Sequence, residues 1–329
     1  QDVQETWAVT GVYPNMDWTP DSNSVIFWAR GKIRKVAADG SGSSIIPFQI
    51  NDSRGVANAP HPKIPVASAS ITTKMPRFAQ VSPDGQRVVF ESLGKLYTKS
   101  VAGSPAKRLT TGGDGRELFP SWSRDGNKIV FVDWTDAGLG QIKTASVVDG
   151  STQTITNRRG HYARPHFSPD GQTIVFEMGG GGYLTSPEYS VDDGVYKVAA
   201  AGGAPVRVVK GAAGPQFGAS NDRIFMVDRK DGKRILLSSD LNGEAKRTHA
   251  TGELTNDYIV SPDGQYLAFR QSYEAYVVPL LPGTQSVAVS PKSKSLPVTR
   301  VSKNGADYIH WSQNGKKLHW SLGATLYSA

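Results

Sequence analysis

The sequence contains no cysteine, so disulfide bonds, thiolate metal sites and cysteine nucleophiles are all excluded. No apolar run approaches the roughly 18 residues that a membrane-spanning helix needs, so the sequence predicts no membrane span. It also lacks a sustained apolar stripe with helical spacing, while its 35 glycines and 20 prolines are distributed along the whole chain. These features favour an all-β protein of short strands joined by turns.

Other functional motifs are missing as well. No Gly-x-Ser-x-Gly elbow occurs, which argues against a serine hydrolase within this chain. The net charge is +8, but the basic residues are dispersed and no nucleic-acid-binding motif accompanies them. We therefore expect no nucleic-acid partner.

One short phrase recurs along the chain. It is clearest as FSPDGQTIVFE at residues 167–177, VSPDGQRVVFE at 81–91 and VSPDGQYLAFR at 260–270. Asp-Gly favours a tight hairpin turn, and the alternating apolar residues that follow it indicate a half-buried strand. Degraded copies bring the total to seven, each with one residue that marks its turn: Asp21, Asp84, Asp125, Asp170, Asp222, Asp263 and Asn314.

Four strand-like segments in each repeat of about 40–50 residues are typical of a β-propeller blade. The sequence thus predicts a seven-bladed β-propeller of four-stranded antiparallel blades, forming a single domain over residues 1–329. The last repeat supplies only three strands, and we expect the segment ETWAVTG at 5–11 to close the ring as its fourth strand. Residues 49–74 are interpreted as an insertion between the first two blades, because they are proline-rich and weakly patterned.

The repeated phrase P-x-W/F-S-P-D-G-x-x-I-x-F resembles the TolB-like (WD40-like) propeller repeat. Longer stretches, such as TGVYPNMDWTPD and GRELFPSWSRDG, are similar to the propeller region of bacterial amidohydrolase-related proteins. That resemblance implies a bacterial periplasmic or secreted protein in which a metal-dependent barrel is joined to the propeller. The His-x-His pair of such a barrel is absent here. We therefore expect no cofactor in this chain, and a metal only if a barrel is attached.

A candidate ligand site follows from the repeat. Propellers bind small ligands around the central channel, where the chain enters the innermost strand of each blade. In this sequence those entries lie just upstream of each turn motif, so residues far apart in the chain are predicted to meet there. We predict no metal site. The channel-mouth candidates are Arg77, Glu117, Arg164, His166, Asp257, Tyr308 and His310.

Two functions remain open at this point. The first is a non-catalytic propeller that binds a protein or peptide on one face, or gates substrate access for a covalently linked hydrolase domain. The alternative is a polysaccharide lyase or hydrolase at the channel mouth, where His161, Tyr162, Arg164 and His166 fall within six residues. A histidine or tyrosine would then transfer a proton and the arginine would bind a carboxylate. The structural interpretation is that the same side chains form hydrogen bonds with neighbouring blades and fill the channel mouth.

Overall fold

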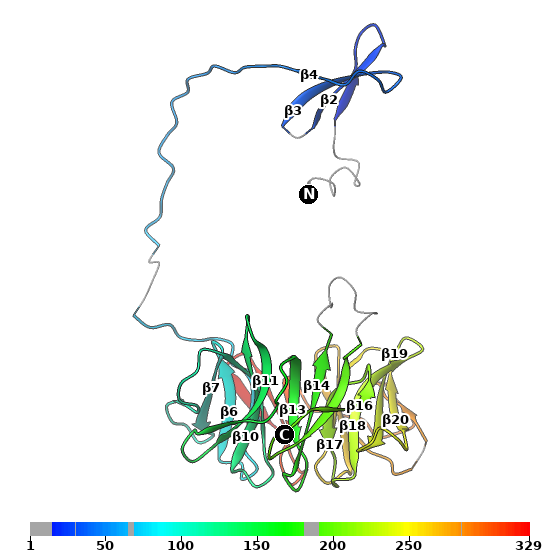
Figure 1. Ribbon diagram of the computed structural model, residues 1–329. Helices are drawn as coiled ribbons and strands as arrows, with labels where there is room; N and C mark the ends of the chain where they lie inside the picture. Colours follow the sequence, from blue (N-terminus) through cyan, green and yellow to red (C-terminus); the bar gives the residue numbers. More distant parts are fainter. Residues whose placement is uncertain (1–14, 30, 65–68, 181–190, 284) are drawn as a thin grey trace. The chain divides into compact units, whose positions relative to one another are not determined.

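The computed structural model describes residues 15–29, 31–64, 69–180, 191–283 and 285–329. In these ranges the chain forms strands and turns but no α-helix, and hence no helix that could cross a membrane. The strands associate into seven sheets in which successive strands pair antiparallel (Figure 1). The prediction of an all-β propeller is confirmed, and each of the seven predicted repeats forms a sheet.

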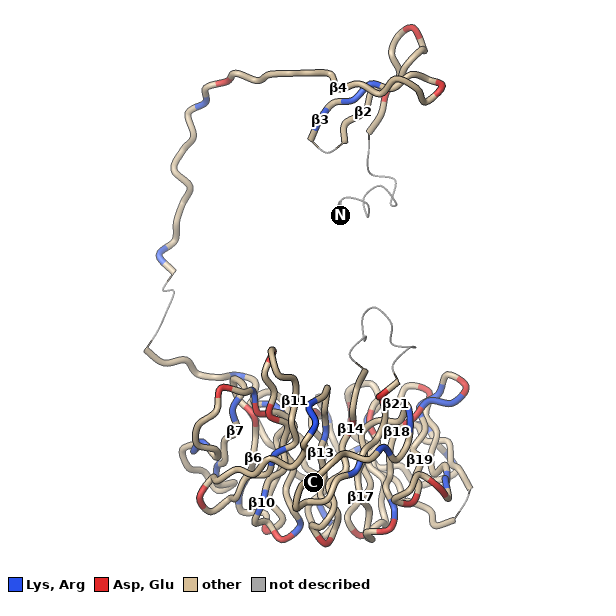
Figure 2. Tube along the Cα trace, in the orientation of Figure 1, with Lys and Arg blue, Asp and Glu red and all other residues tan. Residues whose placement is uncertain are grey.

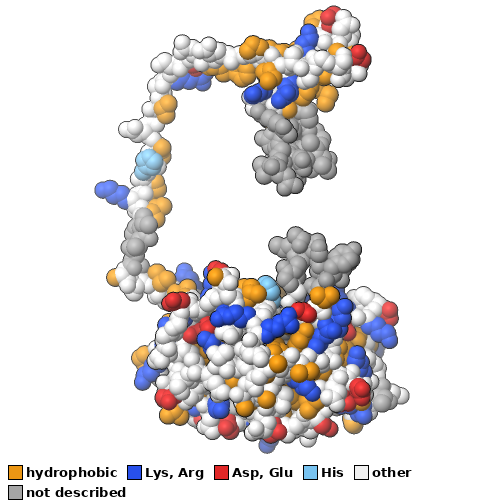
Figure 3. Space-filling view, viewed as in Figure 1, with side chains coloured by type: hydrophobic (Ala, Val, Ile, Leu, Met, Phe, Trp, Pro, Cys, Tyr) orange, Lys and Arg blue, Asp and Glu red, His pale blue; other side chains and the backbone are white. Residues whose placement is uncertain are grey.

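The chain divides into two compact units, Gln1–Ala69 and Ser70–Ala329. In the first unit a single sheet has its strands in chain order: β1 (Met16–Trp18), β2 (Ser24–Ala29), β3 (Lys32–Ala37) and β4 (Ser44–Ile46). Hydrophobic side chains cover much of its visible surface (Figure 3), and Met16 and Phe48 are among the exposed ones. A single domain over residues 1–329 stays a prediction, because each unit is described by itself.

The second unit contains the other six sheets. The first three are four-stranded: β5 (Arg77–Val81), β6 (Arg87–Ser92), β7 (Lys95–Ser100), β8 (Lys107–Arg108); β9 (Arg116–Trp122), β10 (Lys128–Thr135), β11 (Leu139–Ser146), β12 (Thr152–Thr154); and β13 (His161–Phe167), β14 (Thr173–Gly179), β15 (Gly194–Ala199), β16 (Val206–Lys210).

The remaining three sheets vary in strand number. The fourth has five strands: β17 (Ala213–Phe217), β18 (Arg223–Lys230), β19 (Lys233–Asp240), β20 (Arg247–Gly252) and, parallel to β20, β24 (Val287–Ala288). The fifth has four: β21 (Thr255–Val260), β22 (Tyr266–Gln271), β23 (Glu274–Pro279) and β25 (Thr299–Arg300). The sixth has three: β26 (Asp307–Trp311), β27 (Leu318–Leu322) and β28 (Thr325–Ser328).

These six sheets follow one another in a circle. The innermost strands contact each other in the order β5, β9, β13, β17, β21 and β26, and β26 contacts β5 again. Side chains join the neighbours: the indole N–H of Trp122 donates to Gln80 O at 3.1 Å, and Val81 N–H donates to Nε2 of His310 at 2.8 Å. The circle of contacts is thus complete within Ser70–Ala329. The closing strand predicted at 5–11 lies outside the described residues.

The recurring phrase forms the turn between the first and second strands of each sheet. In the third sheet, Ser168 Oγ donates to Asp170 Oδ1 at 2.6 Å and accepts the N–H of Thr173 at 2.9 Å. Hydrogen bonds, first of all from Ser168, hold the pKa of Asp170 below its usual value. Gly171 follows with φ +71°, which glycine adopts without steric cost. These contacts explain why Ser-Pro-Asp-Gly recurs.

Alternating residues of the strands fill the space between neighbouring sheets. Phe176 is fully buried, with its ring 6.0 Å from that of Tyr196 and 4.9 Å from that of Tyr162. Val132 and Ile142 of the preceding sheet complete this cluster. Burying a large apolar side chain contributes about 2–3 kcal/mol, so the ring is stabilised by its sheet-to-sheet contacts.

Lys and Arg are spread over many strands rather than gathered on one (Figure 2).

Residues 49–74, which were predicted to be an insertion between the first two blades, lie between β4 and β5. No strand is assigned to its described residues, 49–64 and 69–74. Most of these side chains are exposed, including Val56 and Ile71. The irregular backbone agrees with the weak hydrophobic pattern of this stretch.

Candidate functional site

The innermost strand of each sheet carries an irregularity at the same place. A register shift against the second strand occurs in β5, β9, β13, β17, β21 and β26. In five of these strands one residue at the shift has a left-handed backbone with φ between 49° and 58°: Phe78, Phe119, Arg164, Gly214 and Tyr308. The four residues other than Gly214 lie six residues before the turn position of their repeats, and Asp257 has that place in β21. Gly214 lies eight residues before Asp222, in the degenerate repeat.

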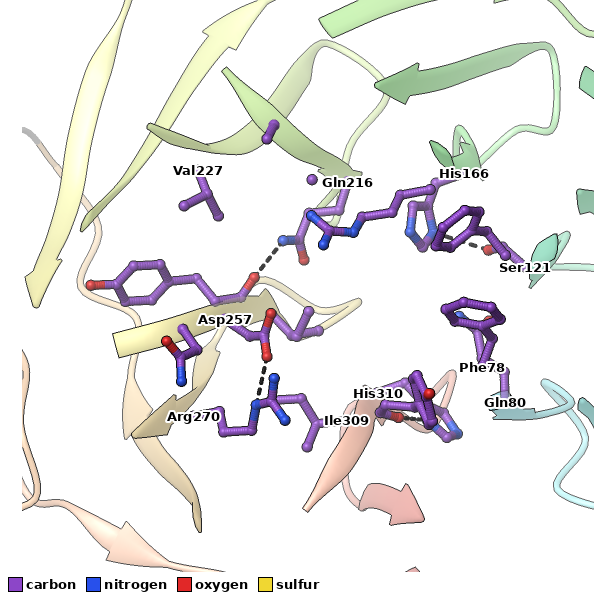
Figure 4. A pocket seen from close by; sticks show the side chains of 18 of the residues that line it. Phe78, Gln80, Ser121, His166, Gln216, Val227, Asp257, Arg270, Ile309 and His310 are labelled. Atoms are coloured by element: carbon purple, nitrogen blue, oxygen red, sulfur yellow. Dashed lines mark hydrogen bonds and ion pairs between the residues drawn. The ribbon is translucent and has the colours of Figure 1, made fainter. Parts of the chain in front are cut away.

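These six positions line one cavity of about 460 Å³, where all six innermost strands meet (Figure 4). One part of its wall is aromatic: the Phe78 ring lies 4.4 Å from the Phe119 ring and 5.1 Å from the Tyr308 ring. We call this set the aromatic arc. The cavity is large enough for a small ligand or a few residues of a peptide.

Three arginines line the same cavity. Arg270 is held by two carboxylates, with Nε 2.7 Å from Asp257 and Nη1 2.8 Å from Asp307. Arg164 has one longer ion pair, 3.4 Å to Glu177, and its side chain is 53% exposed. Arg234 donates to the main-chain oxygen of Asn256, and no carboxylate among the described residues lies within salt-bridge distance of it. Arg164 and Arg234 are therefore the cations available to a ligand.

Below this cavity the channel narrows to a waist. The waist consists of the side chains two residues after the irregularity, and they also line a second, smaller cavity of about 140 Å³. Several of them bridge neighbouring sheets; Gln216, for example, donates to Tyr258 O at 2.7 Å and accepts Val260 N–H at 2.8 Å. The six waist residues are Gln80, Ser121, His166, Gln216, Ile259 and His310.

Both histidines of the waist are neutral at pH 7. His166 Nδ1 lies 2.9 Å from the hydroxyl of Ser121, and burial deep in the ring lowers the pKa of His166 to about 4. His310 accepts the N–H of Val81 through Nε2, and its Nδ1 lies 2.9 Å from Tyr308 O. Nδ1 therefore carries the proton, and burial lowers the pKa of His310 to about 3.

The other end of the channel is crossed by an arginine. Arg124, in the turn after β9, donates to the carbonyl oxygen of Gly218 at the end of β17. This contact skips the whole β13–β16 sheet, which lies between those two sheets in the circle. Burial lowers the pKa of Arg124. The contact narrows the channel at this end, so a ligand has more room at the larger cavity.

The structure brings five of the predicted site residues to this cavity. They come from three different innermost strands: Arg164, His166, Asp257, Tyr308 and His310. Two of them make hydrogen bonds within the ring of sheets: His166 through Nδ1, and His310 through both ring nitrogens. The other three offer side chains at the wide end of the cavity.

Four predicted residues lie elsewhere. Arg77 pairs with Glu91 at 2.6 Å beside the cavity. Glu117 is buried and accepts the N–H of Leu96 at 2.8 Å and the hydroxyl of Thr110 at 2.6 Å.

The remaining two belong to the group proposed for proton transfer. Tyr162 is a core residue whose hydroxyl donates to Arg158 O at 2.9 Å. His161 is exposed, with its ring 5.2 Å from that of Trp134. These two do not converge on the cavity with Arg164 and His166.

Metal binding was expected only from an attached barrel. Among the described residues no group of three or more His, Asp or Glu side chains is placed to hold a metal ion. That finding leaves the absence of a cofactor as an expectation.

Among the cavity residues that sequence reasoning missed are two of its aromatic residues and two of its arginines. Phe78 and Phe119 could have been found, because they occupy the same place before the turn as Arg164. Arg234 and Arg270 come from β19 and β22, outside the innermost strands, and no signal in the repeat pointed to them.

Comparisons with known proteins agree with this architecture. No family model matches the chain. The Tol-Pal system protein TolB of Francisella tularensis is 37% identical over 62 residues, which are 19% of this chain and 14% of that protein. The chain resembles the TolB-like propellers. The matched stretch spans far less than two thirds of TolB, so that protein's activity and partners are not transferred with it.

Two further matches, one in sequence and one in structure, extend the comparison. A Bacillus subtilis protein described as the uncharacterized peptidase YuxL is 26% identical over 161 residues, 48% of this chain and 22% of that protein. A solved oligogalacturonate lyase in complex with manganese aligns with 95% of this chain and 87% of its own, at 12% identity and a TM-score of 0.55. At that identity the likeness establishes the propeller fold alone.

Proposed function

We propose that this TolB-like propeller is a binding module. Its channel mouth would capture an extended peptide that carries acidic and aromatic side chains, without converting it chemically. The observation that carries this proposal is the ring of side chains at irregular positions around one cavity, among them Phe119, Arg164 and Tyr308.

The backbone argument supports a role in binding for these side chains. A left-handed conformation costs a non-glycine residue about 1–2 kcal/mol, and glycine adopts it freely. Gly214 occupies the position in β17, so the fold itself does not need a side chain there. Residues kept at such strained positions cluster at ligand sites.

The chemistry of the wall indicates the ligand. Arg164 is half exposed with one 3.4 Å ion pair, and Arg234 has a main-chain partner, so both can donate charge-assisted hydrogen bonds to carboxylates. The aromatic arc offers ring faces and edges to an aromatic side chain. A suitable probe is the peptide acetyl-Glu-Trp-Glu-Phe-amide, labelled with a fluorophore.

The histidines support binding rather than proton transfer. His310 is held between Val81 N–H and Tyr308 O, and His166 is hydrogen-bonded to Ser121. Both pKa values lie well below 7, at about 3 and about 4, so neither imidazole is a general acid at neutral pH.

Replacing Arg164 with glycine tests its contribution to peptide binding separately from its contribution to folding stability. We expect Arg164→Gly to weaken binding of the acidic peptide by about tenfold or more, because a charge-assisted hydrogen bond contributes about 1.5–3 kcal/mol. The free energy of unfolding should change by less than about 1 kcal/mol, since glycine relieves the backbone at φ 49°. Fluorescence anisotropy and urea unfolding measure the two effects. Arg229→Ala, an exposed arginine outside the cavity, is the control; equal losses in both variants would refute the proposed site.

The wider setting is proposed on the same basis. The resemblance to TolB-like propellers supports a bacterial periplasmic or secreted protein with a protein or peptide partner. The similarity to a protein described as a peptidase supports the idea that the propeller gates access to a covalently linked hydrolase. In that arrangement the peptide captured here would be the substrate of the linked domain.

A second candidate is a polysaccharide lyase acting on acidic sugars. The shared propeller fold with oligogalacturonate lyase and the arginines of the cavity favour it over other enzymes. Incubating the full chain with oligogalacturonate, with and without manganese, tests this candidate. Formation of an unsaturated product that is lost in Arg164→Gly but kept in Arg229→Ala would establish it, and no product would leave the binding module.

A further inference from the structure

The last sheet of the ring lacks an outer strand. The β26–β28 sheet has three strands, whereas every other sheet of the second unit has at least four, so the edge of β28 is open in the described residues. A cleft of about 740 Å³ lies between β28 and the β5–β8 sheet. Phe90 and Tyr97 line it and are only half-buried, although their counterparts Phe176 and Tyr196 in the third sheet are buried.

Two outer strands in the other sheets, β12 and β25, end in a shared pattern. After β12, Ile155 is buried and its N–H donates to Ile142 O at 2.8 Å, while Thr156 Oγ1 accepts the N–H of Ile142 at 3.1 Å. An apolar residue followed by a hydroxyl residue thus pairs with both main-chain groups of one residue on the third strand. The same pattern follows β25, where Val301 and Ser302 contact Ala275 in the same way: Val301 N–H to Ala275 O at 2.9 Å and Ala275 N–H to Ser302 Oγ at 2.9 Å.

This pattern occurs once more, just before the first sheet of the ring. In sequence, Ile71-Thr72 matches Ile155-Thr156 after β12 and Leu109-Thr110 after β8. After β8 only the first half of the pattern is formed, because Leu109 N–H donates to Leu96 O while Leu96 N–H donates to Glu117. The spacing agrees with that after β25, because Thr72 lies six residues before Phe78, as Ser302 lies six before Tyr308. After β12 the interval is longer, since Thr156 lies eight residues before Arg164. Yet Ile71 is 69% exposed, whereas Ile155 is 2% exposed.

The residue of β28 that would form hydrogen bonds with Ile71 and Thr72 can also be identified. Ala275 lies opposite Arg270, one residue after the hairpin pair Gln271–Glu274, and Leu326 has the same place in the β27–β28 hairpin. Ile71 and Thr73 already line the cleft beside Leu326. Lys74 O lies 3.9 Å from where a Cβ on Gly323 would stand, so the chain passes the end of that hairpin.

We propose that residues 70–73 add to β28 as the fourth strand of the last sheet and so complete that sheet from within Ser70–Ala329. Ile71 N–H then donates to Leu326 O, and Leu326 N–H donates to Thr72 Oγ1. The side chain of Ile71 enters the cleft, where it covers Phe90 and Tyr97 as Ile155 covers the third sheet. The cleft is thus a strand-binding slot whose occupant is the chain's own segment.

Cysteine cross-linking in the full chain tests the pairing directly, because the protein has no native cysteine. Opposite residues of paired strands lie about 5.5 Å apart, within the Cα separation that a disulfide requires. We expect Ile71→Cys with Leu326→Cys to form an intramolecular disulfide on mild oxidation, detected by peptide mapping. Ile64→Cys with Leu326→Cys is the control, since Ile64 is exposed and precedes the segment. Equal cross-linking of the two pairs, or disulfide-linked dimers, would overturn the proposal.

Hydrogen exchange provides the second test, in case the cysteines disturb packing. We expect the Leu326 amide to exchange at least about tenfold faster in Thr72→Val than in the native protein, because the valine cannot accept its hydrogen bond. Thr73→Val, which leaves that acceptor in place, should show native exchange. An unprotected Leu326 amide in the native protein contradicts the pairing. So does protection that is lost when residues 1–11 are deleted but kept in Thr72→Val, since residues 5–11 would then fill the slot.

Discussion

Lowering the pH from about 7.5 to about 5 is expected to destabilise the folded protein by about 4 kcal/mol through two histidines. His166 and His310 have pKa values of about 4 and about 3 in the folded protein and near 6.5 when unfolded. Between these values the unfolded chain binds more protons, so stability falls as the pH falls below about 6.5. Each group contributes about 2 kcal/mol over this range. Urea unfolding at the two pH values measures the loss.

A matched variant separates these histidines from other titrating groups. Burial also lowers the pKa of His249 and His319, which adds to the effect in the same direction. In His310→Gln the amide can accept Val81 N–H, as Gln216 accepts the corresponding N–H of Val260. We expect this variant to match the native protein at about pH 7.5 within about 1 kcal/mol and to lose about 2 kcal/mol less on acidification. An unchanged acid loss would show that His310 is not the titrating group.

Replacing Gln216 with leucine is expected to lower the free energy of unfolding by about 3 kcal/mol. Leucine fills a similar volume, but it leaves the N–H of Val260 and the carbonyl of Tyr258 without their partner inside the channel wall. Each buried main-chain group that loses its hydrogen bond costs about 1–3 kcal/mol. Chemical denaturation measures the change.

Gln153→Leu is the control for this substitution. Gln153 donates to Ala201 O at 3.2 Å from an exposed position, where water can replace the contact. We expect a change of less than about 0.5 kcal/mol. A loss as large as that of Gln216→Leu would mean that the waist is not a special point of the fold.

Much of the fold could be predicted because the turn chemistry is local. The Ser168–Asp170 contact and the left-handed Gly171 involve neighbours in sequence, so the repeated phrase carries them directly. The strand that completes the last sheet was harder to assign. Its predicted segment, 5–11, lies outside the described residues. The Ile71-Thr72 pattern is defined by hydrogen bonds such as that of Thr156, which the sequence does not display.

The sequence predicts where the site lies but not which residues line it. Alternation along a strand places Tyr162 and Arg164 on one face, and likewise Glu117 and Phe119. The irregularity in β13 and β9 breaks this alternation, so Arg164 and Phe119 line the cavity while Tyr162 and Glu117 are buried between sheets. Such a register shift depends on pairing with the next strand, which a single sequence does not display.

The arginines outside the innermost strands depend on tertiary structure alone. Arg270 reaches the cavity because Asp257 and Asp307, from two different sheets, hold its guanidinium. No repeat position predicts such a bridge. The charge of the cavity therefore had to come from the structure.

Binding of acidic peptides at the channel mouth is tested by comparing two peptides on the full chain. Labelled acetyl-Glu-Trp-Glu-Phe-amide and its charge-reversed counterpart acetyl-Lys-Trp-Lys-Phe-amide are titrated by fluorescence anisotropy at low and high salt. We predict that the acidic peptide binds at least about tenfold more tightly at low salt, with a smaller difference at high salt. Equal affinities, or tighter binding of the basic peptide, would contradict the account.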